Sequence, residues 1–119
     1  MKEALMNIIT QGTKIEGKLY VNGSIRIDGE VHAEYIEATE KIIIGPDGIL
    51  KGKVKSKSLS SSGVCDGEFH IAELVELLKG ASFDGELTCK RLVVEEGVLL
   101  DGKVNMREGK RLKEKPKES

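Results

Sequence analysis

A five-residue frame recurs along the chain, in which a glycine lies between two charged residues that are themselves flanked by apolar ones. Residues 50–54 and 83–87 are clear copies, and residues 31–35 fit with alanine in place of the glycine. The central positions, here called slots, lie at intervals of 16, 19, 15, 18 and 17 residues, and they are Gly17, Ala33, Gly52, Gly67, Gly85 and Gly102. A steady period of this size predicts a solenoid, because each unit buries its apolar face only by stacking on the next.

Apolar and polar residues alternate around the slots, which indicates strands with one buried face. With a fixed offset, the residues eight positions before the slots are all apolar, namely Ile9, Ile25, Ile44, Leu59, Leu77 and Val94. The residues two positions after the slots are apolar as well, namely Leu19, Tyr35, Val54, Phe69, Leu87 and Val104. We align Gly29 with Gly48 and do not use it as a slot, because it would give intervals of 12 and 23 residues.

These features predict an all-β fold, a single-stranded parallel β-helix of about six coils with three short strands per coil and a triangular cross-section. Coils of such a helix stack about 4.8 Å apart. Equivalent side chains then form columns inside the rod, as we expect for Leu50, Cys65, Phe83 and Leu100. Glycine in the slots lets the backbone turn a corner that a side chain would hinder. An antiparallel sandwich is the alternative, and residues 70–79 also fit a short helix, although the register favours a strand there.

Composition excludes several classes of function. The net charge is −1, from 19 basic and 20 acidic residues, and aromatic residues make up only 3%. Nucleic-acid binding normally needs a basic stripe or a stacking platform, so we expect no nucleic-acid partner. Two cysteines and two histidines without ligand or triad spacing predict no metal, no cofactor and no catalytic residue. Cys65 and Cys89 are interpreted as small apolar residues in a reducing cytoplasm.

Two stretches, residues 12–18 and 97–103, match the GxxxxGK pattern of a phosphate-binding loop. The motif needs a following Ser or Thr and a helix whose N-terminus faces the phosphates. Leu19 and Val104 follow instead, and both stretches are copies of the repeat. We therefore expect no nucleotide binding.

The repeat divides the chain into a flexible N-terminal segment (1–7), a β-helix domain (8–106) and a disordered basic tail (107–119). The tail holds six basic residues against three glutamates, a composition typical of a solvated end. Near the start, Leu5, Met6 and Ile8 form a short apolar group that would contact a membrane weakly. The alternative is that Ile8 and Ile9 simply begin the first coil.

The last coil is among the most apolar, and no cap precedes the polar tail. An uncapped β-helix presents unpaired backbone groups and open apolar columns, which another copy can extend. We therefore predict end-to-end assembly into filaments without nucleotide. The candidate interface residues are Leu92, Val94, Val98, Leu99, Leu100, Val104 and Ile9.

Residues 11–17 (QGTKIEG), 25–31 (IRIDGEV) and 92–97 (LVVEEG), with Ile44-Gly45, Gly48 and Gly52, resemble the bactofilin family in their order and spacing. The resemblance covers about residues 8–106. It implies a right-handed β-helix and non-polar filaments that form without nucleotide. It also implies a bacterial scaffold for cell shape, cell-wall synthesis or polar proteins, in the cytoplasm and often at the inner membrane. An aromatic residue that often serves the filament contact would fall on Leu99 or Leu100.

Two other functions stay open at this point. A monomeric or dimeric solenoid adaptor would present a side face to a partner. A left-handed β-helix acyltransferase would also use aliphatic columns, but its period is six residues, and the slots do not recur at multiples of six.

Overall fold

The computed structural model describes residues 6–106, with side chains from residue 8 onward. The predicted basic tail and most of the predicted N-terminal segment lie outside the described residues. The first strand begins at Met6, two residues before the predicted start of the β-helix domain.

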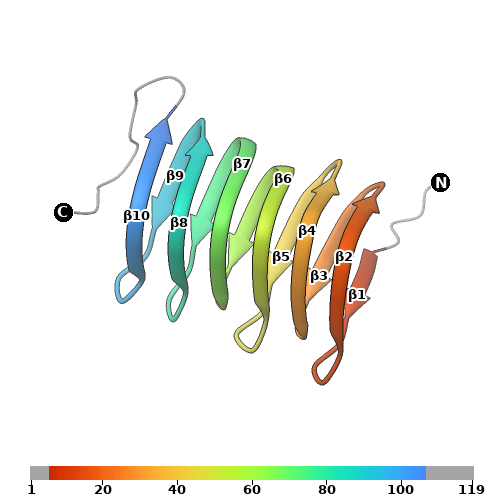
Figure 1. Cartoon of the computed structure of the whole chain (residues 1–119). Helices are drawn as coiled ribbons and strands as arrows, with labels where there is room; N and C mark the ends of the chain where they lie inside the picture. Colours follow the sequence, from red (N-terminus) through yellow and green to blue (C-terminus); the bar gives the residue numbers. More distant parts are fainter. Residues whose placement is uncertain (1–5, 107–119) are drawn as a thin grey trace.

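All ten elements of the described chain are strands, and every pairing between them is parallel. They are β1 (Met6–Ile9), β2 (Lys14–Val21), β3 (Ser24–Ile27), β4 (Glu30–Ala38), β5 (Lys41–Ile44), β6 (Ile49–Ser61), β7 (Val64–Leu77), β8 (Ser82–Cys89), β9 (Arg91–Val94) and β10 (Leu99–Met106). They wind into about six coils, which confirms the predicted parallel β-helix. In Figure 1 the near strands run upward and the far strands downward while the chain advances from right to left, so the helix is right-handed.

Each coil has three sides, here called A, B and C. Side A consists of β1, β3, β5, residues 58–61 of β6, residues 74–77 of β7, and β9. Side B holds the residues just before each slot, and side C holds those just after it. Because β7 runs unbroken through residues 70–77, the strand prediction for this stretch is confirmed over the helical alternative.

The slots form one continuous column at the corner between sides B and C. The register pairs Gly17 with Ala33, then Gly52, Gly67, Gly85 and Gly102 in turn. The glycines of this column have φ between 109° and 131°, where other residues are strained. From Gly52 onward, a Cβ at each glycine would also overlap the carbonyl oxygen of the preceding slot residue. Glycine at this corner therefore allows the coils to approach closely.

The predicted inward position of Tyr35 is wrong. A register shift after Ala33 places Ile36, not Tyr35, in the column of Leu19 and Val54. Alanine disfavours the positive φ that the glycines adopt. The second coil from the N-terminus, formed by β3 and β4 and here called coil 2, contains one extra residue at this corner, a β-bulge. Tyr35 consequently faces outward, 5.8 Å from the ring of Tyr20, and its hydroxyl donates to Glu37 Oε1 at 2.8 Å.

The fixed offset of eight residues is also wrong in two coils. Ile27, not Ile25, pairs with Ile9 and Ile44, and Ser61 takes the place predicted for Leu59. The reason is the length of the corner between sides A and B. This corner has two residues in coil 2 (28–29) and in the coil of Ser61 (62–63), but four in the coil between them (45–48). The alignment of Gly29 with Gly48 is confirmed, because Ile49 N donates to Gly29 O at 2.9 Å.

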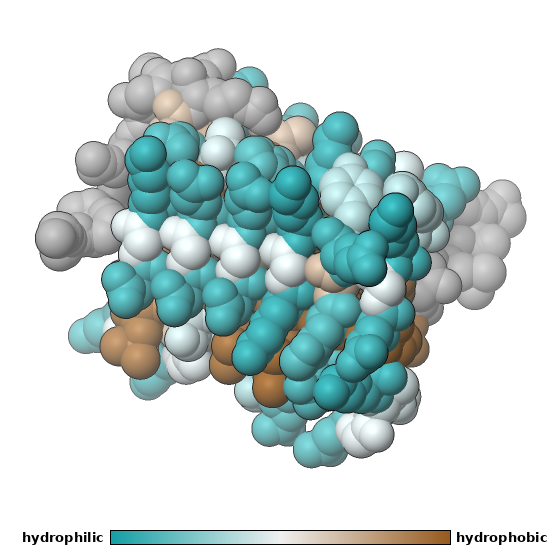
Figure 2. Space-filling model, in the orientation of Figure 1, coloured by the Kyte–Doolittle hydropathy of each residue, from teal (hydrophilic) through white to brown (hydrophobic). Residues whose placement is uncertain are grey.

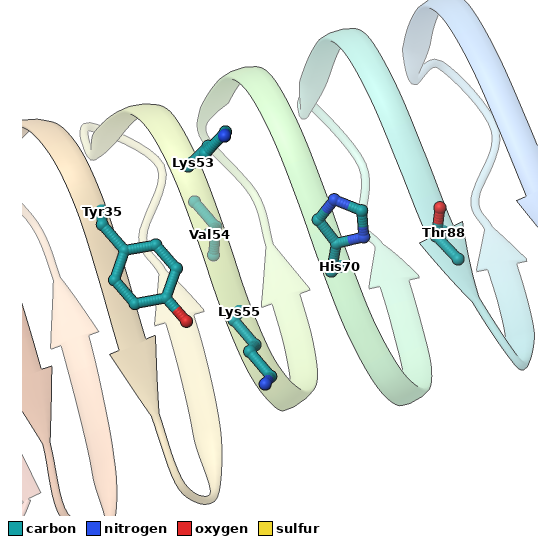
Figure 3. A pocket seen from close by; sticks show the side chains of 6 residues that line it. All are labelled: Tyr35, Lys53, Val54, Lys55, His70 and Thr88. Atoms are coloured by element: carbon teal, nitrogen blue, oxygen red, sulfur yellow. The ribbon is translucent and has the colours of Figure 1, made fainter.

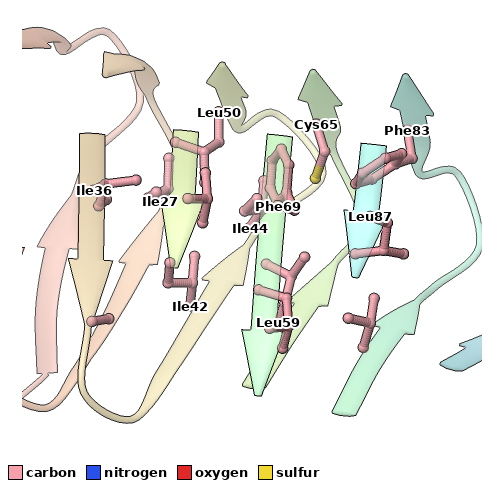
Figure 4. Close-up of a cluster of buried hydrophobic side chains, with 14 of the residues drawn as sticks. Ile27, Ile36, Ile42, Ile44, Leu50, Leu59, Cys65, Phe69, Phe83 and Leu87 are labelled. Atoms are coloured by element: carbon pink, nitrogen blue, oxygen red, sulfur yellow. The ribbon is translucent and has the colours of Figure 1, made fainter. Parts of the chain in front are cut away.

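The core runs through the middle of the rod as stacked aliphatic columns (Figure 4). Leu50, Cys65 and Phe83 are almost completely buried in the predicted column. The ring of Phe69 meets the ring of Phe83 edge to face, with centroids 5.0 Å apart. Interiors are close-packed, and small side chains at Cys65 and Ser61 in the same coil balance the volume of Phe69.

Ser61 is fully buried and hydrogen-bonded. Its Oγ accepts from Gly63 N at 3.2 Å and from Cys65 Sγ at 3.3 Å. Burial raises the pKa of the Cys65 thiol to about 12, although the Ser61 hydrogen bond lowers it somewhat. The thiol stays protonated at neutral pH and therefore acts as a small core residue.

Candidate functional site

A shallow groove follows the slot column along the side of the described rod. It is lined by Gly52, Gly67 and Gly85, with Glu68 and Glu86 on its flank. Figure 2 shows this pale row of small residues between two hydrophilic rows. No large apolar side chain lines the groove, and a partner lying in it would meet mainly backbone and charged side chains.

A second hollow of about 370 Å³ lies on side C, between Tyr35 and Thr88 (Figure 3). Lys53, Lys55 and His70 line it. A carboxylate lies beside two of these side chains, since Glu68 is 3.9 Å from Lys53 Nζ and 3.8 Å from His70 Nε2.

Within residues 6–106, no group of three or more His, Cys, Asp or Glu side chains is placed to hold a metal ion. The two stretches that match the phosphate-loop pattern lead into β2 and β10, not into helices. Their second glycines, Gly17 and Gly102, belong to the slot column. The pattern is therefore the structural repeat itself. The same range contains no helix with the length and hydropathy that a membrane crossing requires.

The end coils differ from the rest of the rod because, within residues 6–106, each has a neighbouring coil on one side only. At the C-terminal end, β9 pairs with β7 and β10 pairs with β8, and within the described chain neither has a second partner. Interior members of the same columns are fully buried, whereas Val94, Val98, Leu100, Val104 and Met106 are only half-buried. This end therefore presents an apolar patch beside a free strand edge.

The N-terminal end has the same character. Among the described residues, β1 pairs only with β3 and β2 only with β4. Ile15, Leu19 and Val21 lie in columns that are buried in the interior coils, and here they are half-exposed. In the described part of the chain, both ends of the rod thus combine unpaired backbone groups with exposed apolar columns, which is the arrangement that favours association of strand edges.

The predicted interface residues take different positions in this arrangement. Val94, Val98, Leu100 and Val104 lie at the C-terminal end and are partly exposed. Leu99 points outward from side B and is 70% exposed. Leu92 and Ile9 are only 6% and 7% exposed, so they support the end coils from inside and offer little contact surface.

Sequence reasoning missed four apolar residues of the end coils, namely Ile15, Leu19, Val21 and Met106. The signal that would have found them was present. Ile15 and Leu19 are the apolar members of the first frame copy, and Met106 continues the alternation after Val104. The prediction took only Ile9 from the N-terminal end, although a solenoid without caps has two open ends.

The candidate membrane residues are only partly described. Leu5 lies outside the described residues, and Met6 belongs to β1 without a described side chain. Ile8 points outward from side A and is 57% exposed.

Comparisons with known proteins agree with this geometry. A family model named bactofilin and described as polymer-forming cytoskeletal matches residues 7–105. The chain is similar to bactofilin BacP of Myxococcus xanthus (strain DK1622), with 28% identity over 92 residues. That alignment covers 77% of this chain and 38% of the relative, so the chain spans less than half the length of the curated relative it matches. No solved structure gives a significant match.

Proposed function

Because the chain belongs to the bactofilin family of polymer-forming, non-enzymatic cytoskeletal proteins, we propose that it assembles end to end into filaments that need no nucleotide. The observation that carries this proposal is the pair of open end coils. Each leaves a strand edge unpaired and its apolar columns half-exposed within the described chain. Stacking a second copy on either end would pair the edge and bury the columns, so both effects favour assembly.

We further propose that like ends meet, which makes the filament non-polar. A contact between like ends is isologous, so each end has to match only itself. In the cell, such a filament would act as a scaffold in the cytoplasm that supports cell shape or localises cell-wall or polar proteins. The family resemblance supports this role.

Replacing Leu100 by glutamate tests the proposal. The half-buried side chain lies in the column that a second copy would cover, and burying an unpaired carboxylate there is costly. We expect wild-type protein to form filaments visible by electron microscopy without nucleotide, and the variant to form none and remain in the supernatant after ultracentrifugation.

Val64→Glu is the matched control, because Val64 is 37% exposed on side B of an interior coil, away from both ends. It should still assemble, and circular dichroism should show β-structure in both variants. Long filaments from folded Leu100→Glu would contradict a contact through this end. A wild-type protein that stays monomeric at high concentration would contradict polymerisation and favour the solenoid adaptor.

We also propose a weak membrane contact through Leu5, Met6 and Ile8. The exposure of Ile8 supports it, and many copies along a filament would strengthen a weak individual contact. Ile8→Ser should reduce the fraction of assembled protein that sediments with liposomes while leaving the filaments intact. Equal co-sedimentation of both proteins would argue against it.

A further inference from the structure

The N-terminal end carries a steric feature that the C-terminal end does not share. At every glycine slot from Gly52 onward, the space that a Cβ would occupy is filled by the carbonyl oxygen of the preceding slot residue. A Cβ on a slot glycine would therefore point along the rod, toward the coil on its N-terminal side.

Gly17 is the first residue of this column, and the described chain places no coil before it. A Cβ at Gly17 would have no heavy atom of the described chain within 4 Å. Its φ of 109° nevertheless resembles the 125° to 131° of the later slot glycines. The corner at Gly17 thus has the conformation and the open space that let another strand approach closely, on a side where the described chain supplies no strand.

The geometry points to Gly17 as a residue that a second copy of this chain requires at the N-terminal end of the rod. This inference rests on the proposed end-to-end assembly. Backbone stacked there at the usual strand spacing of about 4.8 Å would crowd the space that a Cβ needs, as it does at the slot glycines of the interior coils. The unpaired edge of β2 and the half-exposed Ile15 and Leu19 lie on the same end face.

Ala33 shows how the fold changes where a side chain occupies this column. It is the one slot that is not glycine, and the chain accommodates it with a register shift and an extra residue. A contact between two rigid end coils has no such extra residue available. A methyl group at position 17 should therefore keep the apposed strand from reaching pairing distance.

The test compares Gly17→Ala with Gly23→Ala in the full chain. Gly23 has a similar φ of 116° and equally open surroundings, so both substitutions strain the backbone alike. Gly23 stacks beneath Glu40, whose N donates to Gly23 O at 2.9 Å, and Glu40 stacks beneath Lys57. This second column carries long exposed side chains in interior coils, so a methyl group at position 23 leaves stacking unobstructed.

We expect the two variants to unfold at similar temperatures by circular dichroism. Gly23→Ala should assemble as wild type does, whereas Gly17→Ala should raise the critical concentration for filaments at least about tenfold. Analytical ultracentrifugation should show Gly17→Ala as monomers, or as pairs joined through the C-terminal end. Equal critical concentrations for the two variants would overturn the role of Gly17 while leaving end-to-end assembly intact. A wild type that does not assemble would instead overturn the proposed function.

Discussion

Replacing Gly85 by alanine should cost this protein its cooperative fold. The added Cβ would overlap the carbonyl oxygen of Gly67 and lie 2.9 Å from its carbonyl carbon and 3.0 Å from its nitrogen. These are backbone atoms inside a paired ladder, so they cannot rotate away as a flexible side chain would. The φ of 125° adds strain of about 1–2 kcal/mol. We expect a loss of more than about 4 kcal/mol, from a total stability of about 5–15 kcal/mol.

Gly97→Ala is the matched control for this prediction. Gly97 also has a positive φ, of 86°, but a Cβ there would have no heavy atom of the described chain within 4 Å. It should show only the backbone strain, which is a small drop in the thermal midpoint measured by circular dichroism. A Gly85→Ala protein that unfolds at the same temperature as Gly97→Ala would show that the coils can separate locally and that the steric account is wrong.

A rescue variant separates steric overlap from a general intolerance of position 85. Coil 2 already contains alanine in the slot, followed by the extra residue of its bulge. Gly85→Ala with one glutamate inserted after it copies the Ala33-Glu34 pair. If the bulge is what accommodates the methyl group, the insertion should restore part of the cooperative transition.

Replacing Phe69 by alanine should have the second-largest effect. Phe69 is fully buried, and its ring packs edge to face on Phe83. Its own coil already has small interior side chains at Cys65 and Ser61, so no large side chain of the same coil is available to fill the cavity. Buried Phe→Ala changes cost about 3–5 kcal/mol. That corresponds to a fall of on the order of 10–20 °C in the thermal midpoint of a domain of this size.

Tyr20→Ala is the control for Phe69→Ala, because Tyr20 is also aromatic but is 69% exposed. Its removal should cost less than about 1 kcal/mol. Both midpoints must be measured at a concentration where the proteins are monomeric, because assembly itself stabilises the folded chain. Similar midpoints for the two variants would mean that the Phe69–Phe83 contact contributes little to the stability of the core.

The column of slots could be predicted from the sequence because its backbone conformation and close packing restrict which residue fits each slot. A residue that must have positive φ and no Cβ is nearly always glycine, so Gly52, Gly67, Gly85 and Gly102 mark the period directly. The positions of Tyr35 and Leu59 could not be read in this way. They depend on a bulge and on corner lengths, and an aliphatic strand tolerates a shift of two residues without any change in its pattern.

The end coils were only partly predictable, because the sequence shows the type of each residue but not the direction of its side chain. The apolar character of Val98, Leu99 and Leu100 is visible in the sequence, whereas the direction of each side chain is not. The structure turns Leu99 outward and leaves Leu100 in the column. Leu92 was predicted as an interface residue because the last repeat is rich in apolar residues. Its inward position leaves it almost no surface for a contact.

The strands of this rod run across its axis, so the hydrogen bonds between coils point along it (Figure 1). A pull on the two ends would therefore stretch all the bonds of a coil boundary together instead of peeling them apart one at a time. Between neighbouring interior coils, this load is shared by ladders on all three sides, as between β6 and β7 on sides A, B and C. Covalent chain also connects each coil to the next, whereas a junction between two copies would have no such link. A filament of these rods should accordingly yield at its junctions before its subunits unravel, which makes breakage reversible.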